Sequence, residues 1–253
     1  MPLSPELQPG RPQPMPLLPV LNTRPLPQAD RFSAELRAVF GGDLQIVSAP
    51  LMRAEYLSTE LPMGPFGGVV LTSETGAEAA ARLGAARLTP LAWCVGDRTA
   101  EAAEARGFSA ISASGDARDL TRLLAEAPDQ SHLLYLHGED RAADLAAALA
   151  PTGRAVTSLV VYRQVAQPLS EDVRHLISSG APLLVPLYSP RTARLFMEAL
   201  EGLPQEGVLP VVISENARRV LPEPLAGRAI VSSHPDGPGM LAAIGRCFAG
   251  GLA

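Results

Sequence analysis

Cysteine and histidine are scarce in this sequence, and their scarcity excludes two kinds of site. The two cysteines, Cys94 and Cys247, are too few for a four-ligand zinc site or a disulfide scaffold, so both are predicted to be free thiols. The histidines show no spacing typical of metal ligands. They are His132, His137, His175 and His234. We therefore expect no metal cofactor.

A surplus of positive charge and a long apolar run are also missing. The 21 lysines and arginines are outnumbered by 26 aspartates and glutamates, which gives a formal net charge of −5 and disfavours a nucleic-acid-binding protein. No apolar run approaches the roughly 18 residues of a membrane span. Residues 1–27 hold nine of the 25 prolines and do not resemble a secretion signal. The sequence predicts a cytoplasmic protein without a membrane or nucleic-acid partner, preceded by a disordered, proline-rich leader at residues 1–16.

The 253 residues, 47% of them hydrophobic, suffice for one large domain or two small ones. After the leader, short apolar segments alternate with segments of helical periodicity. Strands are expected at residues 17–22, 68–71, 91–95, 133–136, 183–187 and 209–213, with the clearest helical patterns at 27–40, 77–83, 99–106 and 142–150. Such alternation is typical of an α/β fold, in which helices cover both faces of parallel sheets.

A weak internal repeat divides these strand–helix units into two sets. The segments that begin at Leu21, Val69 and Cys94 resemble segments that begin near Tyr135, Val185 and Val212, and each pair is separated by about 115 residues. Two β-rich segments, 42–57 and 155–167, interrupt the alternation at equivalent places, and we interpret them as paired linkers between two domains. The residues alone leave open whether the first unit packs with the next two or with their repeats.

Short motifs along the chain resemble those of the uroporphyrinogen-III synthases. In order they are Asn22-Thr-Arg-Pro25 with Gln28-Ala29, Leu71-Thr-Ser73, Val95-Gly-Asp-Arg-Thr-Ala100, Leu134-Tyr-Leu-His-Gly-Glu-Asp-Arg141, Val160-Val-Tyr-Arg-Gln-Val165 and Leu187-Tyr-Ser-Pro190. The resemblance runs from about residue 17 to the C-terminus. It is interrupted at Ser214-Glu-Asn-Ala217, which replaces a Gly-x-x-Thr turn, at Glu74, which replaces a proline, and at His137, where arginine is frequent.

The resemblance implies two flavodoxin-like, parallel-sheet domains joined by a two-stranded β linker. Domain 1 would combine residues 17–44 with 169–253, domain 2 would be residues 59–153, and the linker strands would be residues 45–58 and 154–168. The implied activity is that of a lyase in haem-type tetrapyrrole biosynthesis, monomeric and cytoplasmic, that needs no cofactor. It closes hydroxymethylbilane, a linear tetrapyrrole with eight carboxylates, into uroporphyrinogen III, with inversion of ring D and loss of water.

A substrate with so many carboxylates calls for hydrogen-bond donors gathered in one place. Helix N-termini supply such donors, and in parallel sheets they collect at the carboxyl ends of the strands. The expected substrate-binding residues lie in or beside these turns: Arg24, Thr72, Ser73, Gly96, Arg98, Thr99, His137, Gly138, Tyr188, Ser189, Ser214 and Asn216. The alternatives are helix capping for the hydroxyl and amide side chains, and surface ion pairs for the arginines.

Tyr162 is the predicted catalytic residue, because the resemblance places it where the family has a tyrosine in the second linker. The reaction needs a hydroxyl to leave a pyrrolic CH₂OH group, and a phenol with a pKa near ~10 is a donor at neutral pH. No nucleophile–histidine motif is visible, so we expect catalysis mainly by orientation of the substrate. The alternative for Tyr162 is simple packing on a neighbouring strand.

Two other functions fit parts of the pattern. A non-enzymatic, two-domain α/β ligand-binding protein would share the repeat and the linkers, although the missing export signal argues against it. A family member that has lost its activity would share the motifs. A nucleotide-dependent Rossmann enzyme is disfavoured, because neither a dinucleotide-binding glycine motif nor a P-loop motif follows any expected strand.

Overall fold

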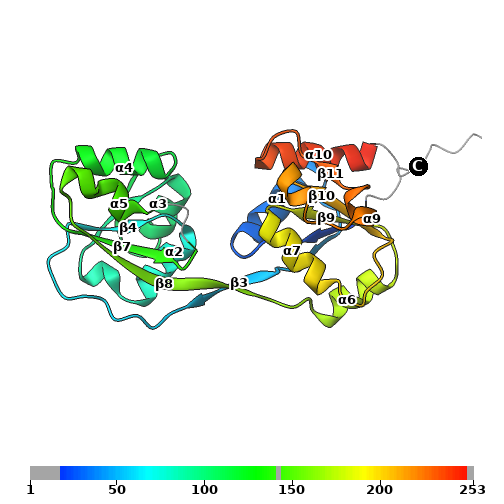
Figure 1. The fold of residues 1–253 in the computed structure, drawn as a ribbon, viewed down its shortest axis with the longest axis horizontal. Helices are drawn as coiled ribbons and strands as arrows, with labels where there is room; N and C mark the ends of the chain where they lie inside the picture. Colours follow the sequence, from blue (N-terminus) through cyan, green and yellow to red (C-terminus); the bar gives the residue numbers. More distant parts are fainter. Residues whose placement is uncertain (1–17, 141–143, 250–253) are drawn as a thin grey trace, which may run out of the picture. The chain divides into compact units, whose positions relative to one another are not determined.

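The computed structural model describes residues 18–140 and 144–249. It divides into two compact units (Figure 1): unit 1 combines Met1–Leu51 with Ala166–Ala253, and unit 2 is Met52–Val165. Both ends of the chain therefore contribute to unit 1. The leader expected at residues 1–16 lies outside the described residues. Within the described ranges, no helix combines the length and the apolar character needed to cross a lipid bilayer.

The sheet of unit 1 has the strand order of the flavodoxin-like folds. Its strands are β1 (Val20–Asn22), β2 (Ile46–Ser48), β9 (Leu183–Leu187), β10 (Val208–Val212) and β11 (Ile230–Val231). They lie in the order β2-β1-β9-β10-β11, and each neighbouring pair is parallel. Counted along unit 1 this is the order 2-1-3-4-5, so the strand order reverses between β1 and β9.

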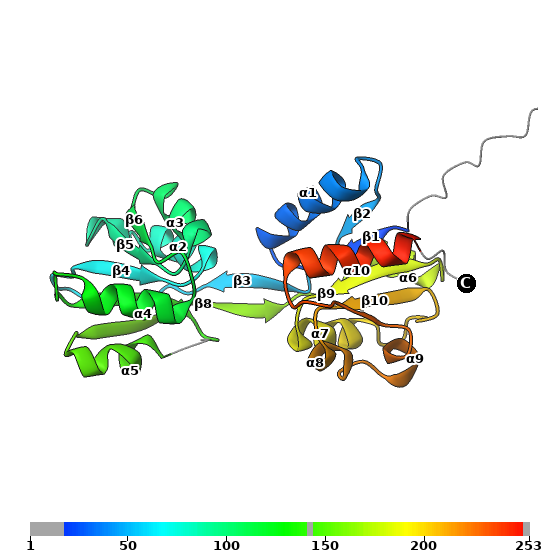
Figure 2. The same cartoon turned by 90° about the horizontal axis from the view of Figure 1, so that it is seen from above.

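Helices cover both faces of this sheet (Figure 2). One face carries α1 (Gln28–Phe40) and α10 (Gly237–Ala249); the other carries α6 (Glu171–Ser178), α7 (Pro190–Ala199), α8 (Glu215–Arg218) and α9 (Glu223–Ala226). Val20 packs with the first layer and Leu21 with the second, because successive side chains of a strand point to opposite faces. The apolar strands expected from the sequence are therefore buried on both sides.

Unit 2 repeats this arrangement and adds one strand. Its strands are β3 (Met52–Tyr56), β4 (Gly68–Leu71), β5 (Leu91–Cys94), β6 (Ser109–Ser112), β7 (Leu133–Gly138) and β8 (Val156–Ala166). They lie in the order β3-β8-β7-β4-β5-β6. Without β3, the order matches that of unit 1 position by position, with β7 in the place of β1 and β4 in the place of β9. The reversal in unit 2 therefore falls between β7 and β4, and both β1–β9 and β7–β4 are parallel neighbours.

The two faces of the second sheet are covered by different helix pairs. The elements are α2 (Glu74–Arg82), η1 (Ala85–Arg87), α3 (Asp97–Glu104), α4 (Ala117–Glu126), α5 (Leu145–Leu149) and η2 (Ala150–Thr152). The small residues of α2 and α3 pack on one face, together with Cys94 and Val161. Leucines of α4 and α5 pack on the other face, together with Trp93. Burial raises the pKa of the Cys94 thiol to about 12, and both cysteines are free.

The segments expected as linker strands differ from the expectation in one respect. Residues 45–58 and 154–168 pair with each other through β3 and β8. At the two ends of this strand pair, the Leu57 N–H donates to the Val161 carbonyl at 3.0 Å and the Gln167 N–H to the Leu51 carbonyl at 2.8 Å. These two bonds show that the strands are antiparallel. The rest of each segment joins a domain sheet: β2 pairs with β1, and most of β8 pairs with β7. The physical reason is that the two sheets bury apolar residues of both segments, such as Val161.

Candidate functional site

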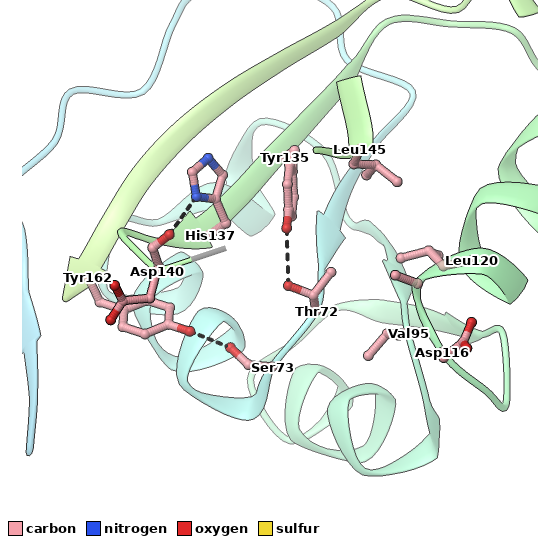
Figure 3. Close-up of a pocket in the computed structure, with 12 residues that line it drawn as sticks. Thr72, Ser73, Val95, Asp116, Leu120, Tyr135, His137, Asp140, Leu145 and Tyr162 are labelled. Carbon is pink, nitrogen blue, oxygen red and sulfur yellow. Dashed lines mark hydrogen bonds between the residues drawn. The ribbon is translucent and has the colours of Figure 1, made fainter. Parts of the chain in front are cut away.

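A cavity of about 340 Å³ opens at the carboxyl end of the unit 2 sheet, where the strand order reverses (Figure 3). Ligands of open α/β sheets bind at this kind of position. The lining residues lie on β7, β8, α4 and α5 or directly follow β4, β5 and β7, together with the residue that caps α4: Thr72, Ser73, Val95, Asp116, Ala117, Leu120, Tyr135, His137, Gly138, Asp140, Leu145 and Tyr162. The cavity thus combines apolar side chains with hydroxyl groups, one imidazole and two carboxylates, and such a mixture is found in small-molecule sites.

Tyr162 reaches the cavity from β8 and is held by the N-terminus of α2. Its hydroxyl lies 2.9 Å from Ser73 Oγ, and either oxygen can donate in this hydrogen bond. Ser73 is the N-cap of α2, and its Oγ accepts the Gly76 N–H at 2.9 Å. When Ser73 donates to the tyrosine oxygen, the phenolic proton of Tyr162 is directed elsewhere and becomes available to a ligand.

The surroundings of Tyr162 keep its phenol protonated. Burial raises its pKa above the ordinary value of 10.0, the hydrogen bond from Ser73 opposes this, and the Tyr135 and Asp140 side chains raise it further. Figure 3 shows the Asp140 carboxylate beside the Tyr162 ring. A tyrosine with a raised pKa is a hydrogen-bond donor throughout the neutral range.

Tyr135 and His137 also line the cavity. Both lie on β7, two residues apart, so they share one face of the strand, and their rings are 4.6 Å apart. The Tyr135 hydroxyl lies 3.3 Å from Thr72 Oγ1. His137 Nδ1 lies 2.7 Å from the Gly138 carbonyl oxygen. Since a carbonyl only accepts, Nδ1 carries a hydrogen, and in the neutral ring Nε2 is then the acceptor.

Comparison of the sequence with known protein families shows the family to which this chain belongs. The sequence profile described as "Uroporphyrinogen-III synthase HemD" matches residues 30–242, which is most of the chain. The chain belongs to the uroporphyrinogen-III synthase HemD family. This is a family of hydro-lyases that act on a tetrapyrrole substrate. The resemblance stated from the motifs is thereby confirmed.

Similar solved structures carry the same family name. A uroporphyrinogen-III synthetase of Helicobacter pylori 26695 is similar with a TM-score of 0.58 and 17% identity, over 79% of this chain and 92% of that chain. A mutant uroporphyrinogen III synthase of Thermus thermophilus is similar with a TM-score of 0.43 and 17% identity, over 90% of this chain and 98% of that chain. A search of curated proteins found no match. The first of these structures confirms the expected α/β fold with two parallel sheets.

Five of the residues expected to bind substrate or to act in catalysis line this cavity. They are Thr72, Ser73, His137, Gly138 and Tyr162. Three others lie at the neighbouring β5–α3 turn and do not line the cavity. Gly96 is the N-cap of α3, and its carbonyl accepts the Thr99 N–H at 3.0 Å, while Arg98 is exposed.

The remaining expected residues belong to unit 1 and lie at the carboxyl end of its own sheet. The Arg24 guanidinium lies 3.9 Å from the centre of the Tyr188 ring, where the strand order reverses between β1 and β9. Ser189 and Ser214 are the N-caps of α7 and α8. The exposed Asn216 accepts a hydrogen bond from Arg219 at 3.2 Å. Both serines therefore cap helices, as Ser73 does in unit 2.

Several cavity residues of this family member were not expected. Tyr135 was not among the expected site residues, although its spacing of two from His137 on one strand places both on the same face. Asp116 and Leu120 were missed because helix α4 was not recognised. Its signal was a capping box, in which Asp116 and Asp119 bond to each other's backbone N–H groups. In the described part of the chain, no cluster of His, Cys, Asp or Glu has the size of a metal site.

Proposed function

We propose that this protein is a uroporphyrinogen-III synthase, which closes hydroxymethylbilane into uroporphyrinogen III with inversion of ring D and loss of water. The observation that carries the proposal is the Tyr162 hydroxyl, which a HemD-family chain presents in a cavity at the strand reversal of unit 2. A protonated donor at that place fits a reaction that begins with the departure of a hydroxyl group.

Tyr162 supplies the proton that the leaving group needs. The lone pair of the pyrrole nitrogen expels the hydroxyl from the CH₂OH group, and the Tyr162 phenol donates its proton to the departing oxygen, so that water leaves. The substituted carbon of the last ring attacks the resulting azafulvenium cation, in which the pyrrole nitrogen keeps its hydrogen, and forms a spiro intermediate, which fragments and recloses. The ring carbon at which the macrocycle closes loses one proton, which returns to the Tyr162 phenolate and restores the enzyme.

Orientation of the substrate supplies the rest of the catalysis. Uncatalysed closure gives the unrotated isomer, so the protein must favour one folded conformation of the chain of rings. A cavity of about 340 Å³ lies at the small end of the range for ligand pockets and holds part of the tetrapyrrole. Thr72 and His137 are the proposed polar contacts there. Arg24, in unit 1, stays a proposed substrate-binding residue, because a guanidinium pairs well with carboxylates.

The test supplies freshly generated hydroxymethylbilane and measures the ratio of type III to type I uroporphyrinogen. We expect type III to dominate in the presence of the protein. Tyr162→Phe should slow formation of type III by about 100-fold, because it removes a general acid. The matched control is Tyr56→Phe, since Tyr56 lies on β3 in the same unit but outside the cavity.

Two outcomes would overturn the proposal. Type I product alone, at the uncatalysed rate, would identify a binding protein or an inactive family member, and calorimetric titration with uroporphyrinogen III would then separate these two. Equal rates for Tyr162→Phe and the wild type, with type III still formed, would leave the activity in place and remove Tyr162 from the mechanism.

A further inference from the structure

The strand ladder beneath Tyr162 contains an irregularity. Along β7 and β8, Leu136 lies opposite Leu159 and His137 opposite Val160, but Gly138 lies opposite Tyr162 rather than Val161. The register therefore advances by one residue at the end of β7. Bulges of this kind redirect a side chain and are frequent next to active sites. Here the shift brings the aromatic ring of Tyr162 over Gly138.

Gly138 leaves no room for a side chain. A Cβ atom at this position would lie 2.7 Å from Tyr162 Cζ and 2.9 Å from the Tyr162 hydroxyl oxygen. Both distances are shorter than any carbon contact that a folded protein tolerates. The φ angle of Gly138 is not in the left-handed region, so the backbone conformation does not require glycine. Glycine is required here by the close approach of the Tyr162 phenol.

The backbones of the two strands are tied at this point. The Glu139 N–H donates to the Tyr162 carbonyl at 2.9 Å, and Val161, the neighbour of Tyr162, is fully buried in the core. A methyl group at position 138 would therefore be accommodated by rotation of the Tyr162 side chain rather than by separation of the strands. Such a rotation carries the phenol away from Ser73 Oγ, its hydrogen-bond partner at 2.9 Å.

We propose that Gly138 is a positioning residue for Tyr162. Because Gly138 has no side chain, the phenol can lie over the register shift between β7 and β8, within hydrogen-bond distance of Ser73. The inference rests on the proposed function, in which Tyr162 is the proton donor. It replaces the expectation that Gly138 contacts the substrate: the residue acts through the tyrosine. Its effect belongs to the chemical step, because misplacement of a catalytic group by about 1 Å costs up to 100-fold in rate.

The variant that tests this is Gly138→Ala. We expect a fall in kcat of between about tenfold and 100-fold with a KM that stays near the wild-type value. Added to Tyr162→Phe, it should change the rate by less than about twofold, since a residue that acts only through the phenol has no further effect once the hydroxyl is gone. Gly42→Ala is the control, because Gly42 has open space around it and lies far along the chain from the cavity residues.

A spectroscopic readout tests the same placement without activity. The protein has four tyrosines, so labelling with ¹³C at Cζ gives four signals, and Tyr162→Phe assigns one of them. Gly138→Ala should move the Tyr162 signal and leave that of Tyr188, in unit 1, in place. An unmoved Tyr162 signal, or a kcat equal to the wild type while Tyr162→Phe is slow, would overturn the inference alone. Absence of type III product from the wild type would instead overturn the proposed function.

Discussion

The sheets of the two units share a five-strand order, but different side-chain arrangements lie where each order reverses. In unit 1 the reversal lies between β1 and β9, and there the Arg24 guanidinium stacks 3.9 Å above the centre of the Tyr188 ring. In unit 2 it lies between β7 and β4, and the same place is a cavity of about 340 Å³. One fold thus provides two positions suited to a ligand, one beside a cation–aromatic stack and the other at a cavity.

The helix caps beside the two reversals show how small the deciding difference is. Ser73 and Ser189 both cap a helix, and their Oγ atoms accept the N–H of Gly76 at 2.9 Å and of Thr192 at 3.0 Å. The Ser189 hydroxyl also bonds to Thr192 Oγ1 at 2.9 Å, whereas Ser73 bonds to Tyr162. Because Gly76 has no side chain, the Ser73 hydroxyl is not bonded to its own helix in this way. The third residue of each helix thus differs together with the hydroxyl partner of its cap, which is Thr192 for Ser189 and Tyr162 for Ser73.

The largest effect is expected at the reversal of unit 1, at alkaline pH. Burial raises the pKa of Tyr188 to about 12 against the lowering effect of Arg24. The unfolded chain releases this proton near pH 10, so the stabilisation is complete below pH 10 and is lost as the pH rises towards 12. The loss amounts to up to about 3 kcal/mol. Urea unfolding at pH 9 and at pH 11.5 measures it.

Tyr188→Phe is the matched variant for this measurement. It cannot ionise, so its free energy of unfolding should fall less than that of the wild type between the two pH values, while other buried groups, such as the Cys94 thiol, affect both proteins equally. The same fall in both proteins would show that the phenol of Tyr188 does not distinguish the folded from the unfolded chain.

The next effect compares the two serine caps. Ser73→Ala and Ser189→Ala should each lower stability by about 1 kcal/mol, because each removes an N-cap. Only the first also removes a hydrogen bond to Tyr162, so it should slow type III formation about tenfold more than the second. Urea unfolding and the product assay are run on the same preparations. Equal rates for the two variants would contradict the comparison.

The fold was predictable from the sequence where the residues carry a local signal. The apolar runs predicted β4 and β9 to the residue, and the spacing of about 115 residues predicted the two equivalent sets of strands. The short edge strand β6, with the sequence Ser-Ala-Ile-Ser, was missed because its side chains alternate between exposed and half-buried and the strand contains no long apolar run. Which strands share a sheet came from the family resemblance, because pairing between β1 and β9 depends on contacts across more than half of the chain.

The candidate site was predictable only in its residue types. Ser73 and Tyr162 were both expected to act, but in separate roles, and their hydrogen bond joins residues 89 positions apart. That contact depends on the register shift between β7 and β8, which no pattern in the sequence predicts. Gly138 shows the same limit: its motif marked it as important, but only the distance to the Tyr162 ring says why.

The smallest effect separates two short cation–aromatic stacks, one in each unit. Arg24 lies 3.9 Å from the Tyr188 ring centre in unit 1, and Arg82 lies 4.1 Å from that of Tyr56 in unit 2, with its side chain 57% exposed. Lysine keeps the charge but loses the planar stack, so Arg24→Lys should lower the free energy of unfolding by about 0.5–1 kcal/mol. Arg82→Lys should cost less, since water screens the exposed stack. An equal or larger loss for Arg82→Lys, measured by urea unfolding, would mean that the stack at the reversal of unit 1 contributes no more to stability than an exposed surface contact.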